Sequence, residues 1–122
     1  MRYILRDSTS TLPFSDAVRV GHMLYLSGQI GADSTGFPVK GGIQAETRQV
    51  LTNIKGVLER NGSSMDEVVK CLVMLADMSE WATMNTVYVT FFPKHKPARS
   101  AMGANGLARG ALVEIECSAT VK

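Results

Sequence analysis

The segment Ala111-Leu112-Val113-Glu114-Ile115-Glu116-Cys117-Ser118-Ala119-Thr120-Val121 decides the fold. From Val113 onward, apolar residues stand at the odd positions and polar residues at the even ones. Side chains of a β-strand point alternately to its two faces, so the pattern predicts a strand with one face in a hydrophobic core. Glu114 and Glu116 share the other face, where they are either ordinary solvated residues or part of a site.

A second extended segment, Pro97-Ala98-Arg99-Ser100, lies a short way upstream. Pro97 biases Lys96 away from helical angles, so the chain is expected to leave a helix just before Arg99. The guanidinium presents a planar fork of donors that matches a carboxylate or phosphate held at two points. Arg99 is therefore a candidate ligand clamp, with a surface ion pair as the alternative. Together with the two glutamates, it places one cation and two carboxylates on strands that we expect to be neighbours.

The first half of the chain contains a predicted hairpin. Residues 17–20 and 23–26 are rich in β-branched and aromatic side chains, and Gly21-His22 between them fits a type II′ turn. Ser27-Gly28-Gln29 ends the second strand. A glycine there either lets a ligand or another backbone approach closely or simply bends the strand end.

Two helical segments surround a third extended segment. Apolar residues recur at helical spacing over residues 43–58 and again over 77–92, whereas residues 68–76 are apolar on both faces, as in a fully buried strand. Asn85 and Tyr88 bring polar atoms to the edge of the second helix and are candidates for a site. The side chains of this helix that we expect to face the core are Trp81, Met84, Val87, Tyr88 and Phe91.

The predicted order is strand, strand, helix, strand, helix, strand, strand, which is an α+β arrangement in a single domain over residues 1–122. Two helices can cover only one face of such a sheet. Because the strands over residues 23–26 and 68–76 are apolar on both faces, the other face is expected to be buried against further copies of the chain. The sequence therefore predicts a homo-oligomer.

Composition places the protein among ordinary globular domains: 122 residues, 45% hydrophobic, 20% charged, net charge +2. No basic stripe interleaved with aromatic residues favours nucleic acid as a partner. The first residues, Met1 to Arg6, contain no apolar signal core, and the longest apolar run, Cys71 to Ala76, is too short to span a bilayer. We therefore expect a cytoplasmic protein without a membrane partner.

The cysteines and histidines indicate no special chemistry. Cys71 and Cys117 lie far apart in the sequence without a second pair, so neither a disulfide framework nor a redox motif is predicted, and each is interpreted as a small buried hydrophobe. His22 and His95 lack spaced ligand partners, so no metal is predicted. Gly41-Gly42 precedes a helix, but no phosphate-loop motif follows it.

Seven segments together resemble the reactive intermediate imine deaminase A family, also called the YjgF, YER057c and UK114 family. They follow the family order along nearly the whole chain: Pro13-Phe14-Ser15-Asp16-Ala17-Val18, Tyr25-Leu26-Ser27-Gly28-Gln29-Ile30, Thr47-Arg48-Gln49-Val50-Leu51-x-Asn53-Ile54-Lys55, Asp66-Glu67-Val68-Val69-Lys70, Asn85-x-x-Tyr88-x-x-Phe91-Phe92, Pro97-Ala98-Arg99-Ser100 and Val113-Glu114-Ile115-Glu116.

The resemblance implies a chorismate-mutase-like fold, with a mixed sheet and two helices on one face. It implies homotrimers with sites at the subunit interfaces and hydrolysis of enamine and imine intermediates to 2-oxo acids and ammonia, without a cofactor. Arg99 would bind the substrate carboxylate and Glu114 would position or activate water. The other residues that the resemblance places around the substrate are Ser27 and Gly28 from an adjacent subunit, together with Phe14, Asn85 and the backbone of Ala101.

Two positions depart from the family pattern. The family often has tyrosine where Phe14 stands and cysteine where Ala101 stands. Loss of the tyrosine hydroxyl removes a polar contact or proton donor, whereas loss of the thiol matters less if only the backbone touches the ligand.

Three alternatives stay open at this point. The chain is a trimeric module that binds small carboxylate metabolites without turnover, a deaminase of another carboxylated enamine, or a ribonuclease like some relatives, for which the charge pattern gives little support.

Overall fold

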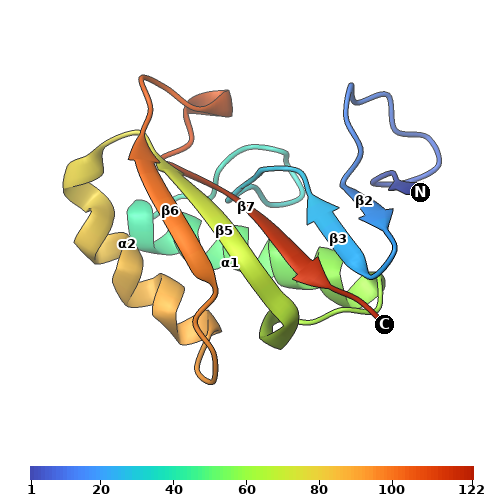
Figure 1. Cartoon of the computed structure of the whole chain (residues 1–122). Coiled ribbons are helices and arrows are strands. Elements are labelled where there is room, and N and C mark those ends of the chain that lie inside the picture. Colours follow the sequence, from blue (N-terminus) through green and yellow to red (C-terminus); the bar gives the residue numbers. More distant parts are fainter.

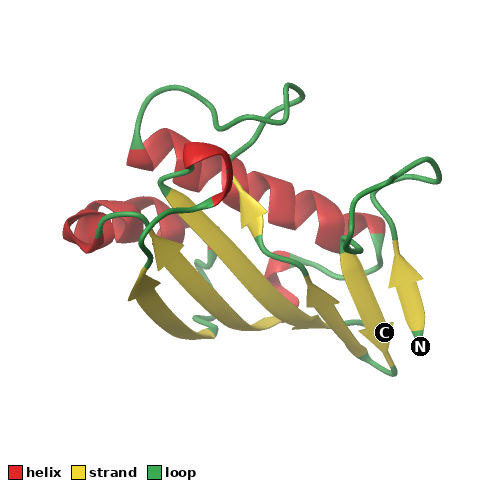
Figure 2. Cartoon of the chain, turned by 90° about the horizontal axis from the view of Figure 1, so that it is seen from above, coloured by secondary structure: helices red, strands yellow, loops and turns green.

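The computed structural model describes all residues, 1–122, as one seven-stranded mixed sheet with two helices on one of its faces (Figures 1 and 2). The strand order is β1-β2-β3-β7-β5-β6, with β4 also paired to β7, and only β5 and β6 run parallel. The strands are β1 (Arg2–Ile4), β2 (Ala17–Val20), β3 (Met23–Leu26), β4 (Gln29–Ile30), β5 (Val68–Leu75), β6 (Ala98–Gly103) and β7 (Val113–Thr120).

Strand β7 lies at the centre of the sheet and pairs with β3, β4 and β5. Its alternation is as predicted: Val113 and Ile115 are fully buried, and Glu116 is exposed. The hairpin of β2 and β3 is confirmed too, with Gly21 at φ +58 and no positive φ at His22, as a II′ turn requires. The local patterns that predicted these strands are therefore sufficient for them.

Helix α1 (Ile43–Arg60) packs its apolar side on the sheet, and Gly62, at φ +81, follows its last turn. Helix α2 (Trp81–Tyr88) is shorter than the helix predicted over residues 77–92. Short 3₁₀ turns, Met78–Glu80 and Val89–Phe91, extend it at both ends, as is common at helix termini. Asp77 caps the first of these turns by accepting a hydrogen bond from the backbone of Ser79 at 2.9 Å.

Two short strands were not predicted, and strand β5 is buried on one face within the single chain. Strands β1 and β4 were missed, because segments of three and two residues are too short to show a period. Strand β5 is fully buried only on the face that carries Cys71 and Val73. Leu72 and Met74, on the other face, are half-buried in the single chain, because the helices lie on one side only (Figure 2).

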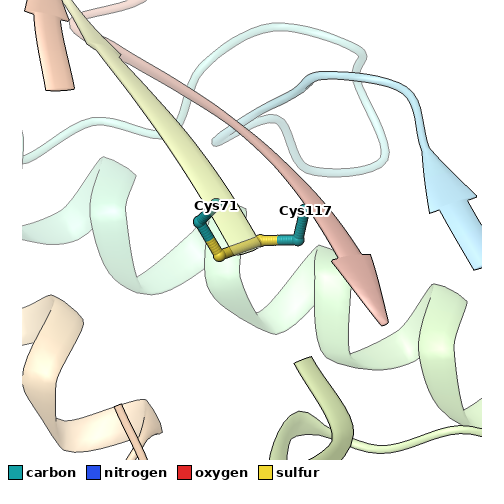
Figure 3. Close-up of a disulfide and its surroundings, with 2 residues drawn as sticks. All are labelled: Cys71 and Cys117. Carbon is teal, nitrogen blue, oxygen red and sulfur yellow. A yellow bond between two sulfur atoms is a disulfide. The ribbon is translucent and has the colours of Figure 1, made fainter. Parts of the chain in front are cut away.

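The cysteines also differ from the prediction. Cys71 on β5 and Cys117 on β7 are partners in the sheet register and are joined by a disulfide, with their Cα atoms 4.2 Å apart (Figure 3). Both are buried, as expected, but the interpretation as two separate thiols is wrong. Distance along the chain is not distance in space, since antiparallel pairing brings together residues 46 positions apart.

Neither helix has the length and apolar composition that a membrane span requires.

Candidate functional site

The two principal candidates, Arg99 and Glu114, do not lie on neighbouring strands. Strand β5 separates β6 from β7, so this expectation is wrong. Arg99 is level with Cys71, whose side chain is buried on the helix-covered face, whereas Glu114 lies between the core residues Val113 and Ile115 and therefore points to the opposite face. Within one chain, a small substrate cannot touch both side chains.

Arg99 lies at the edge of the sheet beneath α2. Its Nη1 donates a hydrogen bond of 2.7 Å to the side-chain oxygen of Asn85. The guanidinium carbon lies 4.8 Å from the ring centre of Tyr88 and 5.7 Å from that of Trp81. These cation-π contacts hold the guanidinium without neutralising it, and no carboxylate forms a salt bridge with it. Arg99 thus keeps a charge and free donors available for an anion.

Helix α2 therefore contributes more than core packing. Trp81, which we expected to face the core, is 42% exposed and lies against Arg99 instead, because α2 covers the sheet edge rather than its centre. Asn85 was a candidate from the sequence, and the structure brings it to the same guanidinium as Tyr88. Ala101, two residues beyond Arg99 on β6, lies on the same face and packs against the core.

The other predicted residues line one cavity of about 770 Å³. Glu114, Ser27, Gly28 and Phe14 all contribute to its wall. The Ser27 hydroxyl donates a 2.6 Å hydrogen bond to the backbone oxygen of Ser15, which ties the cavity wall to the segment that carries Phe14. The structure thus divides the predicted site into two groups, one around Arg99 and one around Glu114.

Gly28 explains how the Glu114 carboxylate fits into this wall. A Cβ at Gly28 would lie 3.2 Å from the carboxyl carbon of Glu114 and would overlap its Oε2. The absence of a side chain therefore leaves the space that the carboxylate occupies. The group that comes close to Gly28 is the Glu114 side chain of the same chain, rather than the ligand or backbone considered from the sequence.

Burial raises the pKa of the Glu114 carboxyl above its ordinary value, and the nearby Glu116 carboxylate adds to the effect. A carboxyl group with a raised pKa holds and releases a proton closer to neutral pH than an ordinary glutamate. This is the property that a general base and acid needs.

Sequence reasoning missed several residues of the cavity wall. Arg6 forms a salt bridge of 3.1 Å with the buried carboxylate of Asp16, and Gln29 and Arg109 also line the cavity. None of them stands in a spacing that signals chemistry by itself. No three His, Cys, Asp or Glu side chains lie close enough together to hold a metal ion.

The strand order, together with two helices that pack on one face of the sheet, defines the fold class. It is the chorismate-mutase-like α+β fold. Among solved structures of this fold, that of Escherichia coli TdcF with bound serine is similar to the chain at a TM-score of 0.89 and 28% identity, covering 99% of this chain and 100% of that one.

Sequence comparison then identifies the family. The profile of the family described as Endoribonuclease L-PSP matches residues 6–121. A RutC family protein of Pyrococcus horikoshii is 46% identical over 108 residues, covering 88% of this chain and 86% of that protein. The 2-iminobutanoate/2-iminopropanoate deaminase of Mus musculus is 44% identical over 108 residues, covering 88% of this chain and 80% of the mouse protein. The chain belongs to this family, the YjgF/RidA family, which confirms the resemblance seen in the sequence motifs.

Proposed function

We propose that the protein is an enzyme that hydrolyses 2-imino acids and their enamine tautomers to 2-oxo acids and ammonia. The observation that carries the proposal is the pair of unlike groups described above. Arg99 is a guanidinium held by neutral partners, and Glu114 is a carboxyl group with a raised pKa in a cavity. Similarity to the mouse deaminase supports the reaction, and serine bound to TdcF supports a small carboxylate ligand.

The proposed active site is composed from two copies of the chain. Arg99 and Glu114 point away from each other across the sheet, so a substrate that needs both must lie between the Arg99 edge of one copy and the Glu114 cavity of the next. The uncovered sheet face, with Tyr25 and Met102 each 49% exposed, gives the copies an apolar surface on which to associate. A cyclic trimer, as the resemblance implies, would repeat this contact and close the ring.

In the proposed reaction, Arg99 binds the substrate carboxylate and fixes the imine carbon near the Glu114 carboxylate. Glu114 takes a proton from a water molecule as the water oxygen bonds to the imine carbon. Glu114 returns this proton to the imine nitrogen, which becomes an amine on the carbon that carries the new hydroxyl. Glu114 then takes the hydroxyl proton and passes it to the amine, so the carbon–nitrogen bond breaks, ammonia leaves and the oxygen becomes the 2-oxo group. No electrons are exchanged, so the protein's own side chains suffice for every step.

The experiment is hydrolysis of an imine made in situ by an amino-acid oxidase, with 2-oxo acid release as the measurement. We expect acceleration by the natural protein and loss of acceleration in both Arg99→Ala and Glu114→Ala. Glu59→Gln is the matched control, because Glu59 is an exposed carboxylate on α1 and does not line the Glu114 cavity. Turnover that survives in Glu114→Ala would overturn its proposed role.

The same variants separate the deaminase from the alternatives. A module that only binds carboxylate metabolites would show no acceleration with any imine, yet Arg99→Ala would still weaken its binding of a small carboxylate. A deaminase of a different enamine would accelerate one of several amino-acid-derived imines and not the others. The family description names an endoribonuclease. Histidine is the most frequent acid–base residue in enzymes, but neither His22 nor His95 belongs to the groups around Arg99 and Glu114. These two groups therefore give ribonuclease activity no particular support.

A further inference from the structure

The cavity that contains Glu114 is larger than the smallest imino acids require. Its volume of about 770 Å³ is in the range that holds ligands of drug size, whereas an imine of three or four carbons has only a few heavy atoms. The rest of the wall is therefore available to whatever the substrate carries at its other end. The residues of this wall include Arg109.

Three properties of Arg109 bear on ligand binding. It is the only non-glycine residue of the chain with a positive φ, at +55. Its guanidinium carbon lies 4.6 Å from the ring centre of Phe37, and it forms no salt bridge with any carboxylate. A left-handed backbone at a residue with a side chain costs free energy, and such conformations persist where the surrounding structure holds them, often at ligand sites.

Of the other cations in the cavity wall, Arg6 is paired with Asp16, whereas Arg60, like Arg109, forms no salt bridge. The planar fork of Arg109 is therefore available to an oxygen anion of a ligand.

We infer that Arg109 is a specificity-determining residue that selects ligands with a second carboxylate, so that the preferred substrates are imines of acidic amino acids. This rests on the proposed function for the reaction, but the binding preference does not depend on turnover. One carboxylate goes to Arg99 of the neighbouring copy, and the other goes to Arg109 in the wall of the Glu114 cavity. Phe37 holds the guanidinium by its ring face and leaves the planar fork free for bidentate contact.

The test is equilibrium binding by calorimetry with two product-like probes, 2-oxoglutarate and 2-oxohexanoate. They share the 2-oxo acid end and differ in the charge at the other end. We expect the natural protein to bind 2-oxoglutarate the more tightly by roughly threefold to tenfold, as suits an exposed charge pair, with the difference shrinking as salt is added. Arg109→Ala should abolish the difference and leave the affinity for 2-oxohexanoate unchanged.

Two further variants make the result interpretable. Arg109→Gly suits the left-handed backbone, so it removes the side chain without adding backbone strain. Arg48→Ala removes the same charge from an exposed position on α1 outside the cavity and should keep the preference. Equal binding of the two probes by the natural protein, or a preference that survives in both Arg109 variants, would overturn the inference. Because binding is measured, absence of imine hydrolysis would count against the proposed function alone.

Discussion

Replacing Gly28 by alanine should disable the protein without unfolding it. Gly28 does not have a positive φ, so its backbone accepts alanine. The new methyl group would lie 3.2 Å from the carboxyl carbon of Glu114 and 3.4 Å from its Cγ, and would overlap the terminal oxygen. Because this oxygen is the far end of a flexible side chain, Glu114 can rotate away at a cost of about 0.5–1.5 kcal/mol.

The free energy of unfolding should therefore change little. Alanine in place of glycine restricts the unfolded chain and stabilises the fold by about 0.4–1 kcal/mol, which offsets most of the rotation cost. Activity should fall by about 100-fold, since a misplacement of the reacting group by about 1 Å has an effect of that size. The assays are urea unfolding and imine hydrolysis on the same preparation.

Gly56→Ala is the matched control for this prediction. A Cβ at Gly56 would also meet the far end of a flexible side chain, with Nη1 of Arg60 at 3.0 Å, and Gly56 lines the same cavity. Because it lies inside α1, alanine should stabilise the protein by up to about 1 kcal/mol and leave activity unchanged. Full activity in Gly28→Ala, or a loss of stability above about 3 kcal/mol, would refute the reasoning.

Three further predictions concern other parts of the molecule. Arg99→Lys keeps the charge but loses the planar fork, so KM should rise by about tenfold with a smaller change in kcat, as steady-state kinetics would show; an unchanged KM would contradict the clamp. Burial raises the pKa of the Glu46 carboxyl, whose Oε1 accepts a 2.9 Å hydrogen bond from the backbone N–H of Leu112. Its stabilising contribution is thus present below the unfolded pKa and is lost as pH rises through the folded pKa, so Glu46→Gln should be more stable than the natural protein at pH 7 and show a smaller difference near pH 4 in urea unfolding. Reduction of the Cys71–Cys117 disulfide, which closes a loop of 46 residues, should lower the free energy of unfolding by about 2–4 kcal/mol, and equal stability with and without reductant would argue against the bond.

Most of the fold could be predicted from local patterns in the sequence. The alternation of β7, the turn at Gly21 and the helical period of α1 each need only neighbouring residues to be recognised. Each of these features is encoded within one segment of the chain. The family motifs, taken together, predict the mixed sheet with two helices on one face.

The site was predicted less completely, because its geometry depends on how segments are ordered in the sheet. Strand β5 lies between β6 and β7, and the register pairs Arg99 with Cys71 but Glu114 with Met74, whose side chains lie on opposite faces. Nothing in either segment signals this arrangement. Cys71 and Cys117 are partners for the same reason. Trp81 follows the apolar period of its helix, but the helix lies at the sheet edge, where this side chain contacts Arg99 instead of the core.

The central claim is that one active site draws Arg99 and Glu114 from different copies of the chain. The most direct test is to mix Arg99→Ala and Glu114→Ala proteins, each inactive alone, after unfolding and refolding them together. If copies exchange at random, about one quarter of the sites pair an intact Arg99 with an intact Glu114, so activity should return to about one quarter of the natural level. A mixture that stays as inactive as its components, although mixed oligomers form, would contradict the account.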